Sequence, residues 1–399
     1  MIDSGQMLRN AVLCMLAPIL LLASDFKGNW DGAAITNVAR VPFRMEVSES
    51  PARVCFFEDA EPVCSTSARI EGSKLTANWD YMNTVLTLAA ADGSLAGTYI
   101  NLRTKRVTRI EARPHQAEAA PSQAPAKFGG EWEVHSTERP GPGDQLILRQ
   151  SGTELKGTIL RIDGDDGTLV GRVDGNHFAI SHFSGDRPTM LQGTLQPDGT
   201  LELESGSQKL LALRPAEARA RNLAMPLNPL TFAHAKNPDE RFHFNLKDVD
   251  GKTYTEDSFA GKPYVVSITG SWCPNCRDEA PFLAELYQRY HPKGLEMAAF
   301  CFESAEDPTW GPLRAFVRKF HIQYPILVAG EPTAGVLNTV VPQIENLAAY
   351  PTTIYVGKDG RVRSVHTGFP SKGSGEELAR VKEEIRVTIE RLLAEKPVK

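Results

Sequence analysis

The segment Val265-Val-Ser-Ile-Thr-Gly-Ser-Trp-Cys-Pro-Asn-Cys-Arg-Asp-Glu-Ala-Pro281 decides how this chain is interpreted. Residues 265–268 form a short apolar run typical of a buried strand. Apolar residues with helical spacing follow from Pro281 to Tyr290. The two cysteines of the segment therefore stand where a strand ends and a helix begins.

This position gives the two thiols unequal chemistry. Thiols at i and i+3 in the first turn of a helix are close enough to form a small-ring disulfide. The first also lies at the positive end of the helix dipole, among unpaired backbone N–H groups, and both features stabilise its thiolate. Because the thiolate is the attacking species, we expect Cys273 to be the nucleophile and Cys276 the resolving thiol.

A lone CxxC pair is also half of a zinc site, which needs two more Cys or His ligands. His291 and Cys301 are the nearest candidates, but the sequence has no second CxxC and no HxxxH. We therefore expect no metal and no cofactor other than the redox-active disulfide Cys273–Cys276. Cys301 lies in an apolar run and is expected to be a buried, inert thiol.

Residues 241–399 alternate between strand and helix patterns. Strands are predicted over 295–302, 324–328, 352–356 and 362–366, and helices over 313–320 and 376–393. This alternation indicates an α/β domain with a mixed sheet covered by helices.

Four motifs lie along about residues 240–395. They are Phe244-Asn-Leu-Lys-Asp-Val-Asp-Gly251, Gly261-Lys-Pro-Tyr-Val-Val-Ser-Ile268, Trp272-Cys-Pro-Asn-Cys-Arg-Asp-Glu-Ala-Pro281 and Ala349-Tyr-Pro-Thr-Thr353. Together they resemble the TlpA/ResA-type periplasmic branch of the thioredoxin superfamily. The resemblance implies a thioredoxin-like fold and an enzyme that acts as a protein thiol–disulfide oxidoreductase, most often as a reductase.

The resemblance also implies a substrate-binding surface around the cysteines. Pro351 matches the family's cis-proline, which lies beside the disulfide and lets the backbone at Tyr350 pair with a bound peptide; the cis form of an X–Pro bond costs only ~0.5–1 kcal/mol. Trp272 matches the aromatic residue that shields the first cysteine. Pro274 and Asn275, between the cysteines, complete the surface.

Glu279 matches an acidic residue that some members keep close to the CxxC pair. There it could accept or relay the proton of the resolving thiol. It could equally be a solvated residue in the first turns of the helix. Two departures from the common pattern, residues 329–348 and the Gly-rich stretch 368–375, are expected to border the active-site groove.

Residues 25–114 and 128–215 are predicted to be two tandem all-β domains of barrel or sandwich type. Their short runs are separated by Gly, Asp and Ser, with no helical period. Phe26-Lys-Gly-Asn-Trp30 is echoed by Phe128-Gly-Gly-Glu-Trp132, which indicates duplication of one antiparallel meander. An Ala/Pro-rich linker, 115–127, separates the two, and a connector, 216–240, leads to the α/β domain.

The first of these domains contains its own cysteine pair. Apolar runs over 54–57 and 63–65 flank a polar stretch, a pattern that predicts a hairpin. Cys55 and Cys64 would then face each other near its base. We expect them to form a structural disulfide that stabilises a small β domain.

Residues 1–24 are interpreted as a secretory signal. The uncharged run from Ala11 to Ala23 has about 13 residues, whereas a span of the hydrocarbon core needs ~20. Cleavage is expected after Ala23 or Ser24. The protein would then be exported to the periplasm or cell envelope. An uncleaved segment that anchors it in the membrane and a buried N-terminal helix are the alternatives.

A formal charge of −5 over 399 residues gives no footprint for nucleic acid. The expected partners are protein thiols and disulfides of the cell envelope and an upstream membrane electron donor.

Two other functions remain open. A thiol peroxidase of the redoxin type shares the fold, although its loop has Thr three residues before the reactive cysteine, where this chain has Gly270. An envelope binding protein, whose β domains recruit a partner, is the other.

Overall fold

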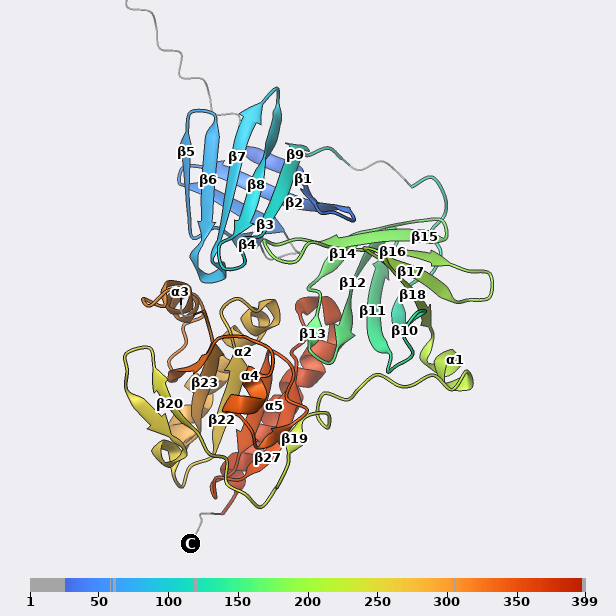
Figure 1. Ribbon diagram of the computed structural model, residues 1–399. Helices are drawn as coiled ribbons and strands as arrows, with labels where there is room; N and C mark the ends of the chain where they lie inside the picture. Colours follow the sequence, from blue (N-terminus) through green and yellow to red (C-terminus); the bar gives the residue numbers. More distant parts are fainter. Residues whose placement is uncertain (1–25, 58, 60–61, 118–120, 305, 397–399) are drawn as a thin grey trace, which may run out of the picture.

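The computed structural model describes residues 26–57, 59, 62–117, 121–304 and 306–396. These residues form two all-β domains followed by an α/β domain, which confirms the predicted fold class (Figure 1). The predicted signal segment, 1–24, lies outside the described residues. No helix within the described ranges is both long enough and apolar enough to cross a bilayer.

The first β domain is a half-barrel built from one antiparallel sheet in the order β4-β3-β2-β1-β9-β8-β7-β6-β5. Apolar and polar residues alternate along its strands, as in β2, where Val41, Phe43, Met45 and Val47 are buried and the residues between them are exposed. The strands are β1 (Gly28–Ile35), β2 (Arg40–Glu49), β3 (Ala52–Phe57), β4 (Pro62–Cys64), β5 (Ser67–Glu71), β6 (Lys74–Trp79), β7 (Thr84–Ala91), β8 (Ser94–Asn101) and β9 (Val107–Pro114), with the 3-10 turn η1 (Asp80–Met82).

The second β domain is a closed barrel of eight strands, because β18 pairs with β10 and β11 pairs with β12. A short ninth strand, β13, lies beside β12. The strands are β10 (Gly130–Ser136), β11 (Asp144–Ser151), β12 (Glu154–Arg161), β13 (Gly164–Asp165), β14 (Leu169–Asp174), β15 (His177–His182), β16 (Thr189–Leu195), β17 (Leu201–Ser205) and β18 (Gln208–Leu213).

The two β domains share a local structure that supports their origin by duplication. In each, the first strand pairs with the last, β1 with β9 and β10 with β18. In each, the tryptophan of the echoed motif donates its indole N–H to the carbonyl of the phenylalanine four residues earlier. These bonds measure 2.9 Å from Trp30 to Phe26 and 2.8 Å from Trp132 to Phe128.

The α/β domain has a mixed sheet in the order β21-β20-β24-β23-β22-β26-β27, in which β22, β23 and β24 are parallel. All six residues of β22 are buried. The elements are β20 (Asn245–Asp248), β21 (Thr253–Thr255), β22 (Tyr264–Thr269), β23 (Glu296–Phe302), β24 (Ile326–Gly330), β26 (Thr352–Val356), β27 (Val362–Thr367), α2 (Pro274–Tyr290), α3 (Gly311–Lys319), α4 (Val336–Val340) and α5 (Glu376–Ala394), with turns η2 (Glu256–Phe259), η3 (His291–Lys293) and η4 (Lys372–Ser374).

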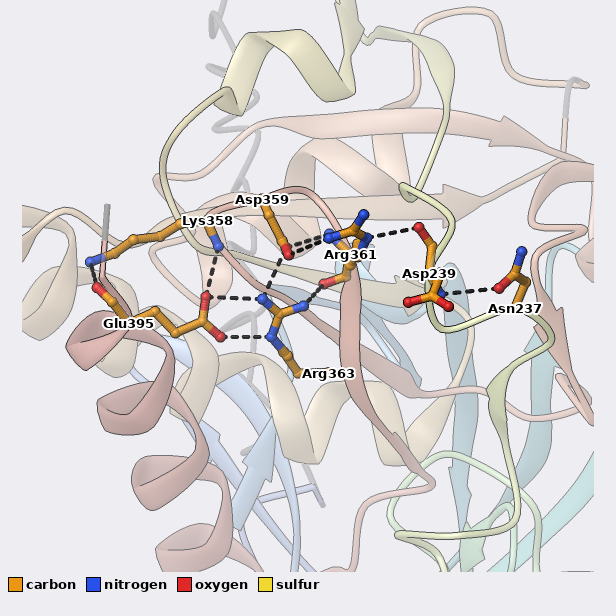
Figure 2. A network of polar contacts seen from close by, with 7 residues as sticks. All are labelled: Asn237, Asp239, Lys358, Asp359, Arg361, Arg363 and Glu395. Atoms are coloured by element: carbon orange, nitrogen blue, oxygen red, sulfur yellow. Dashed lines mark hydrogen bonds and ion pairs between the residues drawn. The ribbon is translucent and has the colours of Figure 1, made fainter. Parts of the chain in front are cut away.

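The connector between the second and third domains carries α1 (Pro215–Ala220) and then β19 (His234–Ala235), which pairs with β25 (Ile344–Glu345). A polar network joins the end of the connector and the end of α5 to the turn before β27 (Figure 2). Arg361 donates to the Asp239 carbonyl at 2.7 Å, and Arg363 donates to Glu395 at 2.7 Å. This network holds the far end of the α/β domain together.

The first β domain packs against both of its neighbours. Phe183, from the loop after β15, enters its aromatic cluster with ring centroids 4.8 Å from Phe43 and 5.4 Å from Tyr99. On the other side, Tyr81 of η1 meets Phe320 just after α3 at 6.0 Å. Figure 1 shows α3 directly beneath this domain. The three domains therefore surround a common centre, which lies at the start of α2.

Candidate active site

Cys273 is the N-cap residue of α2, and its sulfur serves as the capping acceptor. The Cys276 amide donates to Cys273 Sγ at 3.3 Å, and Pro274 occupies the first position of the helix. Proline suits that position because its missing N–H would have no partner there. The Cys273 thiol can also donate to the carbonyl oxygen of Tyr350 at 3.5 Å. The nucleophile proposed from the sequence thus lies at the positive end of the helix dipole.

Cys276 lies one turn inside the helix and is buried. Both cysteines are present as free thiols. Burial raises the pKa of the Cys276 thiol well above its ordinary value, and its hydrogen bond to Cys273 acts in the same direction. Cys276 therefore holds its proton, which suits the resolving role expected of it in sequential exchange.

Glu279 is buried behind the cysteines, with 1% of its surface exposed, so the solvated alternative is wrong. Ser267 of β22 donates to one of its oxygens at 3.0 Å, and Thr353 of β26 donates to the other at 2.6 Å. Burial raises the pKa of the Glu279 carboxyl to about 7, although both hydrogen bonds lower it. Cys276 and Glu279 are three residues apart on α2 and therefore share one helix face.

Trp272, Tyr350 and Phe302 form an aromatic cluster beside Cys273. The Trp272 indole donates to the Phe302 carbonyl at 2.7 Å, and its ring lies 5.1 Å from that of Tyr350. The Tyr350–Pro351 peptide bond is cis. The structure therefore brings the two segments expected to form the substrate-binding surface to the same side of the nucleophile.

The second β domain reaches into the CxxC motif itself. Asn275 donates to the Asp165 carbonyl at 3.2 Å and to the Phe369 carbonyl at 3.4 Å. Gly164 comes so close that a Cβ added there would lie 2.6 Å from the Asn275 side chain. Burial raises the pKa of the Asp165 carboxyl, which accepts the amide of Ser371 at 2.7 Å. Asn275 is thus held between two domains.

The Gly-rich stretch 368–375 does not line the active-site cavity, in contrast to the expectation from the sequence. It is a docking segment for the second β domain, since Arg149 donates to the Lys372 and Gly373 carbonyls at 3.2 and 3.3 Å. Of residues 329–348, only Ala348 reaches the cavity. The remainder includes α4 and several core residues, so this insertion mainly supports the fold.

A cavity of about 630 Å³ lies in front of Cys273, and all three domains contribute to its wall. From the first β domain, Arg103 places its guanidinium 4.8 Å from the centre of the Trp272 ring. From the second, Arg187 donates to Asn275 at 3.4 Å, and Asp186 forms an ion pair of 2.5 Å with Arg277. None of these contacts was predicted, because no local sequence pattern marks pairs so distant in the chain.

Glu303 is a further site residue that the sequence analysis missed. It follows β23 and accepts the Ser271 amide at 2.6 Å and the Ser271 hydroxyl at 3.0 Å, which fixes the loop before Trp272. Burial raises the pKa of its carboxyl to about 7. A charged residue at the carboxyl end of a buried strand was the signal that could have found it.

The other cysteines lie away from this centre. Cys55 and Cys64 face each other across β3 and β4 and form a disulfide. Cys301 is fully buried, and burial raises its thiol pKa well above the ordinary value. The described residues contain no group of three or more His, Cys, Asp or Glu side chains arranged to hold a metal ion.

Comparisons with known proteins agree on the C-terminal part of the chain. Residues 234–384 match the family model described as Redoxin. The thiol-disulfide oxidoreductase ResA of Bacillus thuringiensis subsp. konkukian is 28% identical over 137 residues, 34% of this chain and 72% of the relative. The ResA of Geobacillus kaustophilus is 29% identical over 129 residues, 32% of this chain and 68% of the relative.

Solved structures align with a similar share of the chain. A thiol:disulfide interchange protein of the thioredoxin family from Chlorobium tepidum is 21% identical, with a TM-score of 0.32, and covers 40% of this chain and 100% of its own. A secreted Mycobacterium tuberculosis disulfide oxidoreductase, homologous to Escherichia coli DsbE, is also 21% identical, with a TM-score of 0.30, over 39% of this chain and 99% of its own.

Proposed function

We propose a mechanism and a cellular setting for this chain, whose C-terminal domain is a thiol–disulfide oxidoreductase of the ResA/TlpA type in the thioredoxin superfamily. In this proposal the protein is exported and reduces substrate disulfides in the cell envelope. The observation that carries it is the N-cap position of Cys273, whose sulfur accepts the Cys276 amide at 3.3 Å beside a second thiol.

The exchange has two steps that balance in atoms and electrons. The Cys273 thiolate attacks one sulfur of the substrate disulfide, forms a mixed disulfide and expels the other substrate sulfur as a thiolate, which takes up a proton. Cys276 then loses its proton and attacks Cys273, which releases the second substrate thiol. Two electrons pass from the enzyme dithiol to the substrate, and the Cys273–Cys276 disulfide remains.

Glu279 is proposed as the group that takes the proton of Cys276 in the second step. Cys276 needs a base because burial raises its thiol pKa. A carboxyl with a pKa of about 7 on the same helix face is matched to neutral pH, at which a general base works best. Trp272, Pro274, Asn275, Tyr350 and Pro351 are proposed as the substrate-binding surface around the reacting sulfur.

The reductive direction requires an electron donor that converts the disulfide back to the dithiol. We propose a membrane-bound dithiol protein as that donor and disulfide-bonded envelope proteins as the substrates. The similarity to thiol-disulfide oxidoreductases named ResA supports the exchange chemistry, and the apolar run from Ala11 to Ala23 supports export. N-terminal sequencing of the mature protein from a cell-envelope fraction would test export, since cleavage after Ala23 or Ser24 gives a defined new N-terminus.

The equilibrium reduction potential of the Cys273–Cys276 pair against glutathione tests the direction. A reductase requires a strongly negative potential, near or below that of thioredoxin at about −270 mV. A value near roughly −120 mV would instead assign the pair to disulfide formation. Failure of the pair to cycle between dithiol and disulfide would refute the catalytic assignment itself.

A further inference from the structure

The reacting sulfur faces the cavity between the three domains. Cys273 is just 2% exposed, yet it forms part of the cavity wall. A volume of about 630 Å³ lies in the range of small-molecule sites, 300–1,000 Å³. Because residues of both β domains lie beside the start of α2, the broad face of a folded protein cannot be laid across Cys273, and the proposed donor, like the substrate, must reach it with a narrow segment. A substrate must be small or must enter as an extended segment.

The described cavity wall contains four arginines and four aspartates, but most of the aspartates are already paired. Asp166 is bound to Arg161 at 2.9 Å, and Asp186 to Arg277 at 2.5 Å. Asp165 accepts backbone amides, including that of Ser371. These carboxylates therefore contribute little free negative charge to the cavity.

The remaining charged groups are mainly positive. Arg103, Arg106 and Arg187 form no ion pair with another described residue, and Asp163 is the remaining acidic group of the wall without one. The Nε atom of Arg103 is buried and has no hydrogen-bond partner among the described residues. The cavity wall thus has three arginines and one aspartate without an ion pair, while Arg103 also interacts electrostatically with the buried Glu303 behind the wall. Guanidinium groups bind carboxylates with good geometry.

Two of these arginines contact residues close to the nucleophile in the chain. Arg103 lies over Trp272, the residue before Cys273, and Arg187 contacts Asn275, two residues after it. They come from different β domains, so their presence in one cavity wall with Cys273 depends on the three-domain arrangement. A ligand whose disulfide lies at Cys273 would present its neighbouring groups to both.

We infer that the cavity binds disulfides that carry carboxylate groups close to the sulfur atoms, and that Arg103 and Arg187 determine this specificity. The inference rests on the proposed function and adds the substrate class to it. The same chemistry occurs in small acidic disulfides and in extended peptide segments with acidic residues next to cysteine. In both, the anionic groups are bound by the β domains while the α/β domain carries out the exchange.

The test uses three small disulfides of similar size and different charge: dithiodipropionate, hydroxyethyl disulfide and cystamine. The rate at which each oxidises the reduced full-length protein is divided by its rate with dithiothreitol, which removes differences in intrinsic reactivity. At low salt the normalised rate for dithiodipropionate should exceed that for cystamine by at least about tenfold, the scale of a charge-assisted hydrogen bond. High salt should reduce the ratio.

Variants then assign the effect to the two arginines. R103Q and R187Q should each lower the ratio, and the double variant should bring it close to one. R103K and R187K keep the charge and should retain part of the selectivity. R69Q is the matched control, since Arg69 is an exposed residue of β5 outside the cavity wall, paired with Glu71 at 3.5 Å; it should leave the ratio unchanged.

The outcomes separate this inference from the function on which it rests. Suppose that hydroxyethyl disulfide oxidises the Cys273–Cys276 pair. If the ratio of the dithiodipropionate rate to the cystamine rate is then near one, or if it is unchanged in the double variant, the proposed specificity is wrong and the oxidoreductase function stands. If no disulfide oxidises the pair, the proposed function fails as well. Linear peptides with a disulfide flanked by Glu or by Gln form the second arm. If the Glu-flanked peptide reacts faster than the Gln-flanked peptide by a ratio larger than that among the small disulfides, the natural substrates are acidic peptide segments.

Discussion

The two cysteine pairs of this protein differ in the backbone that holds them. Cys55 and Cys64 lie directly opposite each other on adjacent antiparallel strands and are joined by a disulfide. Cys273 and Cys276 lie at the start of α2 and are free thiols. Both pairs bring two sulfurs together, but only the second places one at the N-terminus of a long helix.

This difference is the physical basis for the structural role proposed for one pair and the reactive role proposed for the other. In a strand ladder the backbone amides are bonded to the neighbouring strand, so they are not available to a sulfur. The first turn of a helix leaves amides without partners, and one of them points to Cys273 Sγ. The start of a helix interacts favourably with negative charge in general, whereas a bridge between two strands closes a loop of the chain.

The largest expected effect comes from removal of the sulfur at the helix start. Cys273→Ser should lower the rate of exchange with hydroxyethyl disulfide by roughly a thousandfold or more, as is typical when a nucleophile is lost. Stopped-flow tryptophan fluorescence or quenched alkylation would measure the rate. The Cys55→Ser/Cys64→Ser double variant is the control and should keep the wild-type rate. Equal losses in both variants would mean that the proposed division of roles is wrong.

A smaller effect is expected when the resolving thiol is removed. Cys276→Ser should react once, with a first-step rate within about tenfold of the wild type, and then stop as a mixed disulfide on Cys273. Mass spectrometry of the intact protein would show one added substrate half per chain. The adduct should disappear with dithiothreitol. Accumulation of the adduct on Cys301 instead would contradict the assignment of Cys273 as the attacking residue.

Glu279→Gln should change how stability depends on pH. The folded protein holds the Glu279 proton up to about pH 7, whereas the unfolded chain releases it near pH 4.5. Between these values the folded state binds more protons, so this residue makes the free energy of unfolding fall as pH rises. The fall, on the order of 3 kcal/mol from pH 4.5 to 7.5, should be missing in the variant.

Urea unfolding at several pH values would measure this difference, and Glu202→Gln, which changes an exposed carboxyl of β17, is a suitable comparison. Glu279→Gln should also slow the second step of exchange at pH 7 without slowing the first, if Glu279 takes the proton of Cys276. An identical pH dependence in wild type and Glu279→Gln would show that the pKa of the Glu279 carboxyl is not raised in the folded protein.

The sequence predicted what depends on local pattern. The apolar run before Ser271 and the helical spacing after Pro281 placed the CxxC pair at a strand–helix junction, where the structure has it. The hairpin of β3 and β4 followed from two short apolar runs around a polar stretch. Periodicity over a few residues is enough for such features, because they form from neighbours in the chain.

The sequence did not predict what depends on contacts between domains. Asn275 and Asp165 are 110 residues apart, and their hydrogen bond exists only because the turn at Gly164 docks on the start of α2. Arg103 reaches Trp272 from a domain that the sequence described only as β-rich. Arginines in loops have no periodic signature, so the position of Arg103 and Arg187 at the cavity appeared only with the assembled fold.

The smallest effect is expected from the strand pair. Its disulfide joins residues 9 apart in sequence, and closure of so short a loop restricts the unfolded chain by roughly 2–3 kcal/mol. Cys55→Ala/Cys64→Ala should lower the free energy of unfolding of the first β domain by about that amount, measured by urea titration of the full chain. The potential of the Cys273–Cys276 pair should stay unchanged, because the hydrogen bond at the start of α2 does not involve this hairpin. If the potential shifts together with the stability, the two pairs are coupled through the first β domain, and the reactivity of Cys273 is not determined by the helix start alone.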